Sequence, residues 1–281
     1  MQIVYKISEL KKKIKAIKEK DQSIGFVPTM GFLHEGHLSL MRTASNENDC
    51  VVISIFVNPL QFGAGEDLEE YPRDLEKDME KAENAGCDLI FAPLVKEMYP
   101  PGFATFIEVE NLTENLCGAS RPGHFRGVAT VVAKLFNLVE PKRAYFGQKD
   151  AQQALVMRRM VEDLNMDLDL IILPTFREED GLAMSSRNEN LLPQQRREAA
   201  ILFQSLQQAQ EMIAKGERDA GKIKEAMAIT IAEHANAEID YIEITDKVTI
   251  KPLVMLQGEC LIAVAVKFGG TRLIDNLLVE V

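Results

Sequence analysis

The sequence predicts an α/β protein with a Rossmann-like, doubly wound parallel sheet followed by a smaller α+β domain with an antiparallel sheet. The first part is predicted by short apolar runs, rich in β-branched residues, that alternate with helical patterns over the first 174 residues. The second part is predicted by two long helical patterns and three strand-like runs, the last two of which flank Gly269-Gly270, a two-residue hairpin signal. We place the first domain at residues 1–176 and the second at residues 177–281, and we interpret the polar stretch 177–190, at the start of the second range, as an interdomain segment.

Each predicted strand of the first domain is a nearly continuous apolar run, as expected of a parallel strand covered on both faces. These strands span residues 24–27, 51–57, 89–92, 144–146 and 170–173. Apolar residues recur at helical spacing in residues 8–20, 37–47, 72–85, 128–139 and 151–164. In the second domain we expect helices at 193–215 and 220–235 and strands at 239–245, 261–268 and 271–279. Ligands of doubly wound sheets bind where strands end and helices begin, so the segments that follow the strands are the candidate site.

The composition of the 281-residue chain excludes several classes of partner. It has 32 basic and 43 acidic residues, a net charge of −11, which repels nucleic acid and anionic membrane surfaces. No run approaches the roughly 20 apolar residues that cross a bilayer, and the lysine-rich start is unlike a signal peptide. Cys50, Cys87, Cys117 and Cys260 are widely separated and form no Cys-x-x-Cys pair. We expect no nucleic acid or membrane partner, reduced thiols and a cytoplasmic location.

The first candidate motif joins the first of these strands to a helix. It reads Pro28-Thr29-Met30-Gly31-Phe32-Leu33-His34-Glu35-Gly36-His37. Free N–H groups at a helix start carry about half a positive charge, and two imidazoles add donors there, so phosphate fits this position. Zinc is disfavoured because the spacing is not His-Glu-x-x-His and only two further histidines exist. A polar turn with satisfied histidines is the alternative for this motif taken alone.

Two further clusters strengthen the phosphate interpretation. Gly147-Gln148-Lys149-Asp150 follows another strand and opens another helix, so it should emerge at the same sheet edge as the histidines. Met184-Ser185-Ser186-Arg187 supplies two hydroxyl donors and a guanidinium fork from the interdomain segment. Alone, the lysine could be an ordinary surface lysine and the serines an ordinary loop. Together with the histidines, the clusters indicate a triphosphate site.

Six segments of the chain resemble the pantothenate synthetase (pantoate–β-alanine ligase) family, which belongs to the nucleotidyltransferase superfamily. The segments are residues 28–37, 58–62, 71–73, 121–125, 147–153 and 180–188. Residues 34–37 resemble the superfamily's His-x-Gly-His signature, and residues 184–187 resemble its mobile Lys-Met-Ser-Lys-Ser-type loop. The resemblance implies a homodimer in which pantoate and ATP give pantoyl adenylate and pyrophosphate, and β-alanine then attacks to give pantothenate and AMP.

The resemblance also implies roles for individual residues. His34, His37 and Lys149 would be catalytic by meeting the charge that grows on the departing pyrophosphate. Gln61 and Gln153 would hold pantoate and β-alanine. The nucleotide would contact the residues from Met30 to His37, from Gly147 to Asp150, Phe176, and from Met184 to Arg187. Phe176 departs from the small aliphatic residue common in the family.

The resemblance implies ATP as a substrate accompanied by Mg²⁺, and we expect no prosthetic group and assign no residue as a metal ligand. Asp150 could contact the ribose or adenine, or supply one carboxylate to the magnesium. Asp74 and Asp78 are expected to be solvated charges. Two other functions stay open: a nucleotidyltransferase that releases an adenylylated product, and a noncatalytic nucleotide-binding regulator. A kinase is disfavoured because the chain lacks Gly-x-x-x-x-Gly-Lys.

Overall fold

The computed structural model describes residues 1–233 and 237–281, which form two compact units. Unit 1 comprises Met1–Glu110, Arg121–Gly147 and Gln153–Pro174. Unit 2 comprises Asn111–Ser120, Gln148–Gln152 and Thr175–Val281. These units are defined by contacts and do not test whether the chain folds as two domains, so the boundary predicted between residues 176 and 177 stays a prediction.

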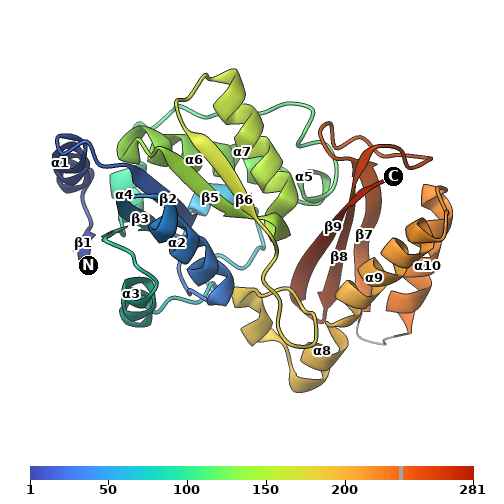
Figure 1. Ribbon diagram of the computed structural model, residues 1–281. Helices are drawn as coiled ribbons and strands as arrows, with labels where there is room; N and C mark the ends of the chain where they lie inside the picture. Colours follow the sequence, from blue (N-terminus) through green and yellow to red (C-terminus); the bar gives the residue numbers. More distant parts are fainter. Residues whose placement is uncertain (234–236) are drawn as a thin grey trace. The chain divides into compact units, whose positions relative to one another are not determined.

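Unit 1 is built on a six-stranded sheet in the order β1-β4-β3-β2-β5-β6, and all neighbouring strands are parallel (Figure 1). Its strands are β1 (Gln2–Val4), β2 (Ile24–Thr29), β3 (Cys50–Ile55), β4 (Leu89–Phe91), β5 (Arg143–Gly147) and β6 (Asp169–Leu173). The direction of winding reverses between β2 and β5, which is where doubly wound sheets bind ligands. The predicted parallel sheet is confirmed; the short edge strand β1 was not predicted.

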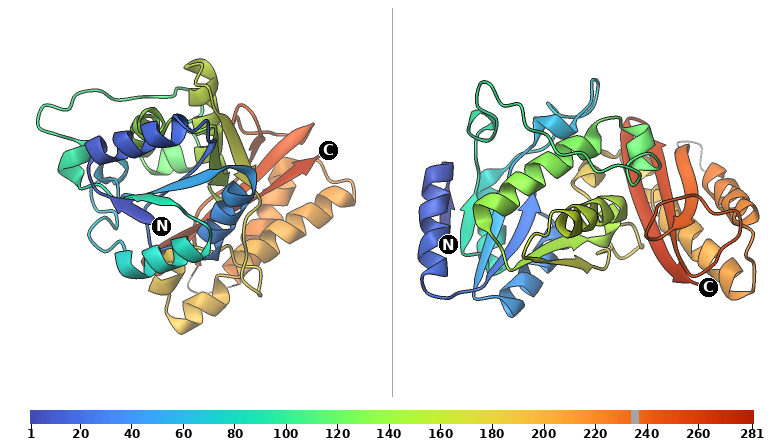
Figure 2. Two further views of the ribbon diagram at one scale, coloured as in Figure 1. Left: turned by 60° about the vertical axis from the view of Figure 1, so that its left-hand side comes forward. Right: turned by 90° about the horizontal axis from the view of Figure 1, so that it is seen from above.

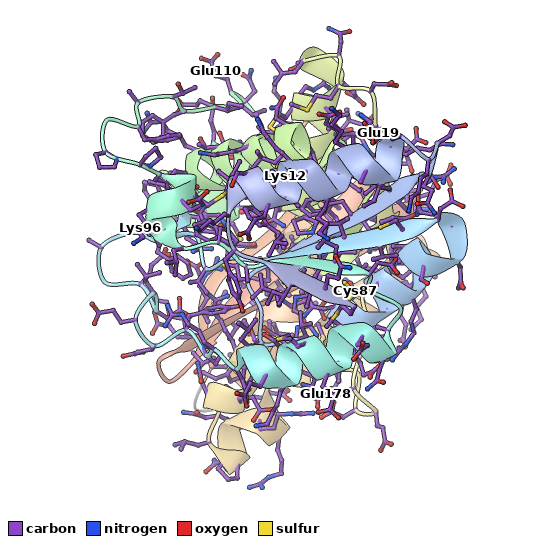
Figure 3. All side chains as sticks on the ribbon, turned by 90° about the vertical axis from the view of Figure 1, so that its left-hand side faces the viewer. Lys12, Glu19, Cys87, Lys96, Glu110 and Glu178 are labelled. Atoms are coloured by element: carbon purple, nitrogen blue, oxygen red, sulfur yellow. The ribbon has the colours of Figure 1, made fainter. Side chains whose placement is uncertain are left out.

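Helices cover both faces of this sheet. The ring of Phe26 in β2 packs edge-on against Phe136 of α6 (His124–Val139), whereas the adjacent Val27 belongs to the opposite core. That core includes Met41 of α2 (Glu35–Glu47) and Ala82 of α3 (Leu75–Asn84). Figure 3 shows α1 (Ile7–Lys18), marked by Lys12 and Glu19, on the opposite side of the sheet from α3. The remaining helices of the parallel-sheet region are α4 (Val95–Met98) and α7 (Ala151–Asp163).

Unit 2 contains an antiparallel sheet in the order β7-β8-β9, with helices α9 and α10 on one face (Figure 2). Its elements are α5 (Cys117–Ser120), η2 (Gln148–Asp150), η3 (Ser186–Asn190), α8 (Pro193–Glu198), α9 (Ile201–Ala214), α10 (Ala220–Ala232), β7 (Ala237–Asp246), β8 (Glu259–Phe268) and β9 (Thr271–Glu280). The predicted hairpin is confirmed, since β8 and β9 flank Gly269, whose φ is +61°. No helix of residues 1–233 and 237–281 is long and apolar enough to span a membrane.

Four predicted helices differ from the structure by more than two residues or in number. The helix expected at 128–139 begins four residues earlier, at His124. The single helix expected at 193–215 is two helices, because the backbone tightens at Ala199 and Leu202 N–H bonds to Ala199 O three residues back. The helix expected at 72–85 begins at Leu75, where the Asp74 carboxylate caps the first turn. The helix expected to end at 235 is described to Ala232, and its predicted last residues, 234 and 235, lie outside the described chain.

Candidate active site

The segment after β2 makes a turn with two residues in the left-handed region. The turn is stabilised by a glycine and by a carboxylate from helix α3. Gly31 has φ +85° and Phe32 has φ +52°, the region that non-glycine residues rarely occupy. Asp78 of α3 accepts hydrogen bonds from Phe32 N at 2.8 Å and from Leu33 N at 2.7 Å. A Cβ on Gly31 would lie 2.9 Å from Asp78 Oδ2, so the turn and the carboxylate require glycine at this position.

Asp78 is therefore a structural carboxylate, and the expectation that it is a solvated charge is wrong. Its residue is 2% exposed, and burial raises the pKa of its carboxyl while the two N–H donors and Lys81 oppose that rise. Lys81, one helical turn further along α3, donates from Nζ to Leu33 O at 2.7 Å. Both sides of the Leu33 backbone are thus held by α3. Spacing alone gave no signal of this, because Asp78 lies among charged residues.

The two histidines of the motif form the start of α2. His34 is the N-cap residue, and its backbone N–H donates to His37 Nδ1 at 3.4 Å. The two rings are stacked at a tilt of 36°, with centroids 4.0 Å apart. The predicted pairing of the imidazoles at a helix start is confirmed; their contact with a nucleotide stays a prediction.

The hydrogen bonds of this segment decide which groups remain for an anion. The N–H groups of Phe32 and Leu33 point to Asp78, and the Glu35 side chain forms an ion pair with Arg42 at 2.8 Å. The first N–H groups of a helix have no acceptor within the helix, which here applies to Glu35 and Gly36. Among the backbone donors of this segment, those of Glu35 and Gly36 are therefore the ones that an anion at this helix start would meet.

Gln61 lies beside this turn. It ends the short helix η1 (Pro59–Gln61), is 9% exposed, and donates from Nε2 to the sulfur of Met30 at 3.2 Å. Its Oε1 accepts from Asn58 Nδ2 at 3.1 Å, which fixes the orientation of the carboxamide. The structure thus brings together two predicted site residues, Met30 and Gln61, from the ends of neighbouring strands β2 and β3.

Residues of the 121–125 segment hold the backbone of Gln61. Its carbonyl oxygen accepts from His124 Nδ1 at 2.8 Å and from Arg121 Nη2 at 3.3 Å. Since a carbonyl only accepts, His124 carries its proton on Nδ1 and accepts from Arg121 at Nε2. Arg121 also forms a two-point ion pair with Glu66, at 2.8 and 2.6 Å, which lowers the pKa of the Glu66 carboxyl. Sequence patterns identified this segment but gave it no task.

Asn58 is a further residue to which sequence patterns gave no role. It is 1% exposed, and its Oδ1 accepts from Tyr99 Oη at 2.8 Å while its Nδ2 donates to Gly127 O at 3.1 Å. A Cβ on Gly127 would lie 2.2 Å from Leu60 O, so glycine is what lets α6 pack directly on η1. The position of this carboxamide just after a predicted strand is the feature of the sequence that could have indicated a role for it.

Unit 2 holds the lysine cluster. Asn276 of β9 donates from Nδ2 to Gln148 O and to Lys149 O, both at 2.9 Å. The neighbouring Gln152 is buried, and its carboxamide bonds to Leu112 O, Asn115 O and Cys117 N. Both the donor and the acceptor groups of the Gln152 carboxamide are thus paired with the backbone.

The other members of this stretch are more accessible. Gln153 is half-buried and Asp150 is exposed. Their ligand contacts stay predictions. No group of three or more His, Cys, Asp or Glu side chains suited to a metal ion occurs among residues 1–233 and 237–281.

The serine-arginine cluster follows a narrow hairpin in unit 2. Met184 N bonds to Phe176 O at 3.0 Å and Glu178 N to Leu182 O at 2.8 Å. Ser185 accepts from Arg187 N at 3.3 Å through its Oγ, whereas Ser186 is buried at 8% exposure. The phosphate contacts expected of this cluster stay predictions.

Residues 2–278 match the family model for pantoate-beta-alanine ligase. It is 57% identical over 281 residues to a pantothenate synthetase of Acetivibrio thermocellus, covering all of both chains. It is 56% identical over 278 residues to one of Thermotoga neapolitana, covering 99% of each.

Solved structures agree with these relatives. Pantothenate synthetase of Thermus thermophilus matches with a TM-score of 0.94 at 48% identity, covering 99% of each chain. Pantoate-beta-alanine ligase of Francisella tularensis, complexed with beta-gamma ATP and beta-alanine, matches with a TM-score of 0.81 at 34% identity, covering 99% of this chain and 97% of that one. The chain therefore belongs to the pantoate–β-alanine ligase family, enzymes that condense pantoate with β-alanine at the expense of ATP.

Proposed function

We propose that this enzyme joins pantoate and β-alanine in two steps through pantoyl adenylate, using the residues predicted from the sequence. The observation that carries the proposal is the contact of Gln61 Nε2 with Met30 at the edge of the sheet where the His34 and His37 helix begins. A carboxamide that both donates and accepts suits pantoate, which has one carboxylate and two hydroxyls. The helix start beside it suits a phosphate.

In the first step, a carboxylate oxygen of pantoate attacks the α-phosphorus of ATP and pyrophosphate leaves. The pantoate carboxylate is itself the nucleophile, so the enzyme needs to position the reactants and to meet the charge that develops. His34, His37 and Lys149 would donate to the leaving pyrophosphate, together with Ser185, Ser186 and Arg187. In the second step, the β-alanine amine attacks the acyl carbon and AMP leaves, and Gln153 would help to hold these substrates.

Magnesium is proposed to enter with the nucleotide. Mg²⁺ prefers hard oxygen ligands and keeps several waters, so phosphate oxygens and water suffice, with Asp150 as a carboxylate available to it. Adenine would lie near Phe176, which is 40% exposed. This ion would lower the negative charge on the phosphates as the carboxylate approaches.

We also propose a cytoplasmic homodimer. All four cysteines are free and buried, which suits a reducing compartment. Tyr5, Leu94 and Val95 of unit 1 are 47%, 61% and 49% exposed, and they flank a hydrogen bond from Ile7 N to Glu97 that joins their two segments. These side chains are a candidate partner surface, and light scattering over a range of concentrations measures the oligomeric state.

Pantoate-dependent exchange of labelled pyrophosphate into ATP tests the first step, and β-alanine-dependent AMP release tests the second. His37→Asn and Lys149→Ala should each lower the exchange rate roughly 100-fold or more. Lys142→Ala, which removes an exposed lysine just before β5, is the matched control and should leave exchange unchanged. Gln61→Ala should raise the KM for pantoate about 10-fold, because the loss of one hydrogen bond to the substrate has about this effect on affinity. Exchange without AMP release would indicate a nucleotidyltransferase, and intact ATP would indicate a binding protein.

A further inference from the structure

Strand β9 of unit 2 contacts both segments to which phosphate contacts are assigned, η2 with Lys149 and η3 with Arg187. Two consecutive residues of this strand, Asp275 and Asn276, are polar although they are 2% and 4% exposed. Burying a polar side chain costs free energy unless its hydrogen bonds are made. The partners of these two residues therefore indicate what the strand holds in place.

Asn276 fixes the backbone of the lysine turn. Its Nδ2 donates to Gln148 O and Lys149 O, so both N–H bonds of the amide go to successive carbonyls of η2. Its Oδ1 faces Gln148 Nε2 at 3.4 Å. The turn that carries Lys149 is thus held by a side chain more than one hundred residues away in the sequence.

Asp275 fixes the hairpin that leads to Ser185. Its two oxygens accept from the Arg177 guanidinium at 2.6 and 3.0 Å, and Arg177 also donates to Gly181 O at 3.0 Å. The guanidinium stacks on Phe203, 4.0 Å from the ring centroid. Arg177 thus bonds to the opposite arm of the hairpin through Gly181 O and links the hairpin to β9 through Asp275.

One hydrogen bond links the contact of Asp275 with the hairpin to the contact of Asn276 with η2. Asn276 N donates to Asp275 Oδ1 at 2.8 Å, so the carboxylate that binds Arg177 also accepts from the residue that binds η2. Burial raises the pKa of the Asp275 carboxyl, and the charges of Arg177 and Lys149 oppose that rise. The lysine turn and the hairpin are therefore held by adjacent residues of one strand.

We propose that Asp275 and Asn276 are positioning residues that set Lys149 and the Ser185–Arg187 segment in a fixed relation for the triphosphate. The inference rests on the proposed function, because it assigns these two segments to the nucleotide. Neither residue is a catalytic residue; each acts through the segment that it holds. A displacement of about 1 Å at reacting groups is enough to cost roughly 100-fold in rate.

The test is a double-mutant cycle in the pyrophosphate exchange assay. Asn276→Leu keeps the shape of the side chain but removes both donors, and it should lower the exchange kcat about 10-fold or more. The KM for pantoate should change by less than about 2-fold, because pantoate is assigned to Gln61 of unit 1. In a Lys149→Ala background the same change should cost less than about 3-fold, since residues that act through one group are not additive.

A second cycle combines Asp275→Asn with Arg187→Ala. Their effects on the exchange kcat should be non-additive, because Asp275 is proposed to act through the segment that carries Arg187. The matched control for Asp275→Asn, Glu280→Gln, replaces an exposed carboxylate on the same strand and should leave exchange unchanged. Asn276→Ser keeps one donor and should give an intermediate loss, which covers the case in which Asn276→Leu fails to fold.

Full additivity with Lys149→Ala, or wild-type exchange in both Asn276 variants, would overturn the positioning role while leaving the proposed function intact. Absence of pantoate-dependent exchange in the wild-type enzyme would instead overturn the proposed function, and this inference with it.

Discussion

Replacement of Asp78 by asparagine is the sharpest test of how the His34 segment is held. Asparagine keeps one acceptor oxygen but turns an amide N–H toward the other backbone donor, Phe32 N or Leu33 N. A hydrogen bond to a charged group is worth about 1.5–3 kcal/mol, and a buried donor left unpaired costs about 1–3 kcal/mol. Relief from burying a carboxylate offsets part of this loss. We expect Asp78→Asn to lower the free energy of unfolding by about 2 kcal/mol.

Denaturant unfolding measures that loss, and the exchange assay measures its consequence for the site. The matched control is Glu80→Gln, which makes the same chemical change at an exposed position of α3. We expect Asp78→Asn to lower kcat/KM for exchange about 10-fold or more, because the turn that precedes His34 loses its anchor. If Asp78→Asn matched Glu80→Gln in both stability and exchange, the assigned role of this carboxylate would be refuted.

The pH dependence gives an independent check. Burial raises the pKa of Asp78 above its ordinary value of 3.8. An acid with a raised folded-state pKa stabilises the fold fully below its unfolded pKa and loses that contribution as pH rises through the folded value. The stability advantage of wild type over Asp78→Asn should therefore shrink as pH rises from 3.8.

Three further predictions use other contacts of the two units. Gly127→Ala should lower the free energy of unfolding by more than about 1 kcal/mol, because its Cβ would meet Leu60 O at 2.2 Å; denaturant unfolding measures this, and wild-type stability would contradict the packing. The ion pair with Arg121 lowers the pKa of Glu66, so its contribution is present above the ordinary pKa of 4.5 and is lost as pH falls through the lowered value. Glu66→Gln should thus flatten the acid limb of a stability–pH curve, and an unchanged limb would argue against the pair. Burial raises the pKa of Cys87 to about 12, so native enzyme at about pH 8 should be alkylated there only after unfolding, which peptide mass mapping would detect; rapid native alkylation would contradict its burial.

Local patterns were sufficient for the elements that bury continuous apolar runs. The strands after residue 20 and the hairpin at Gly269 follow from apolar periodicity and turn chemistry, both of which act over a few residues. Edge strand β1 escaped notice because three residues make no pattern. The break between α8 and α9 falls on Ala199 and Ala200, which are good helix formers, so no local signal marks it.

The candidate site divides in the same way. The place of the histidine pair, after a strand and at the start of a helix, could be predicted from the local pattern, whereas Gln61 was indicated by the family resemblance. Asp78 was not, because a carboxylate in a charged helical segment is expected to be solvated until the fold places backbone donors opposite it. His124 likewise gained a role only when its ring was found against the Gln61 carbonyl.

A common physical reason connects Asp78 and Asn276. Turns at the ends of parallel strands leave backbone donors and acceptors without partners in the sheet, and such buried groups are costly unless a side chain supplies the partner. A carboxylate pairs with N–H groups after β2, and an amide nitrogen pairs with carbonyls after β5, so each turn is matched by a side chain of the opposite hydrogen-bonding character. Because Asp78 takes the N–H groups of Phe32 and Leu33, a phosphate at this edge is left with donors that begin only at the helix itself. The carboxylate thus fixes the turn and takes up two backbone donors at the end of β2.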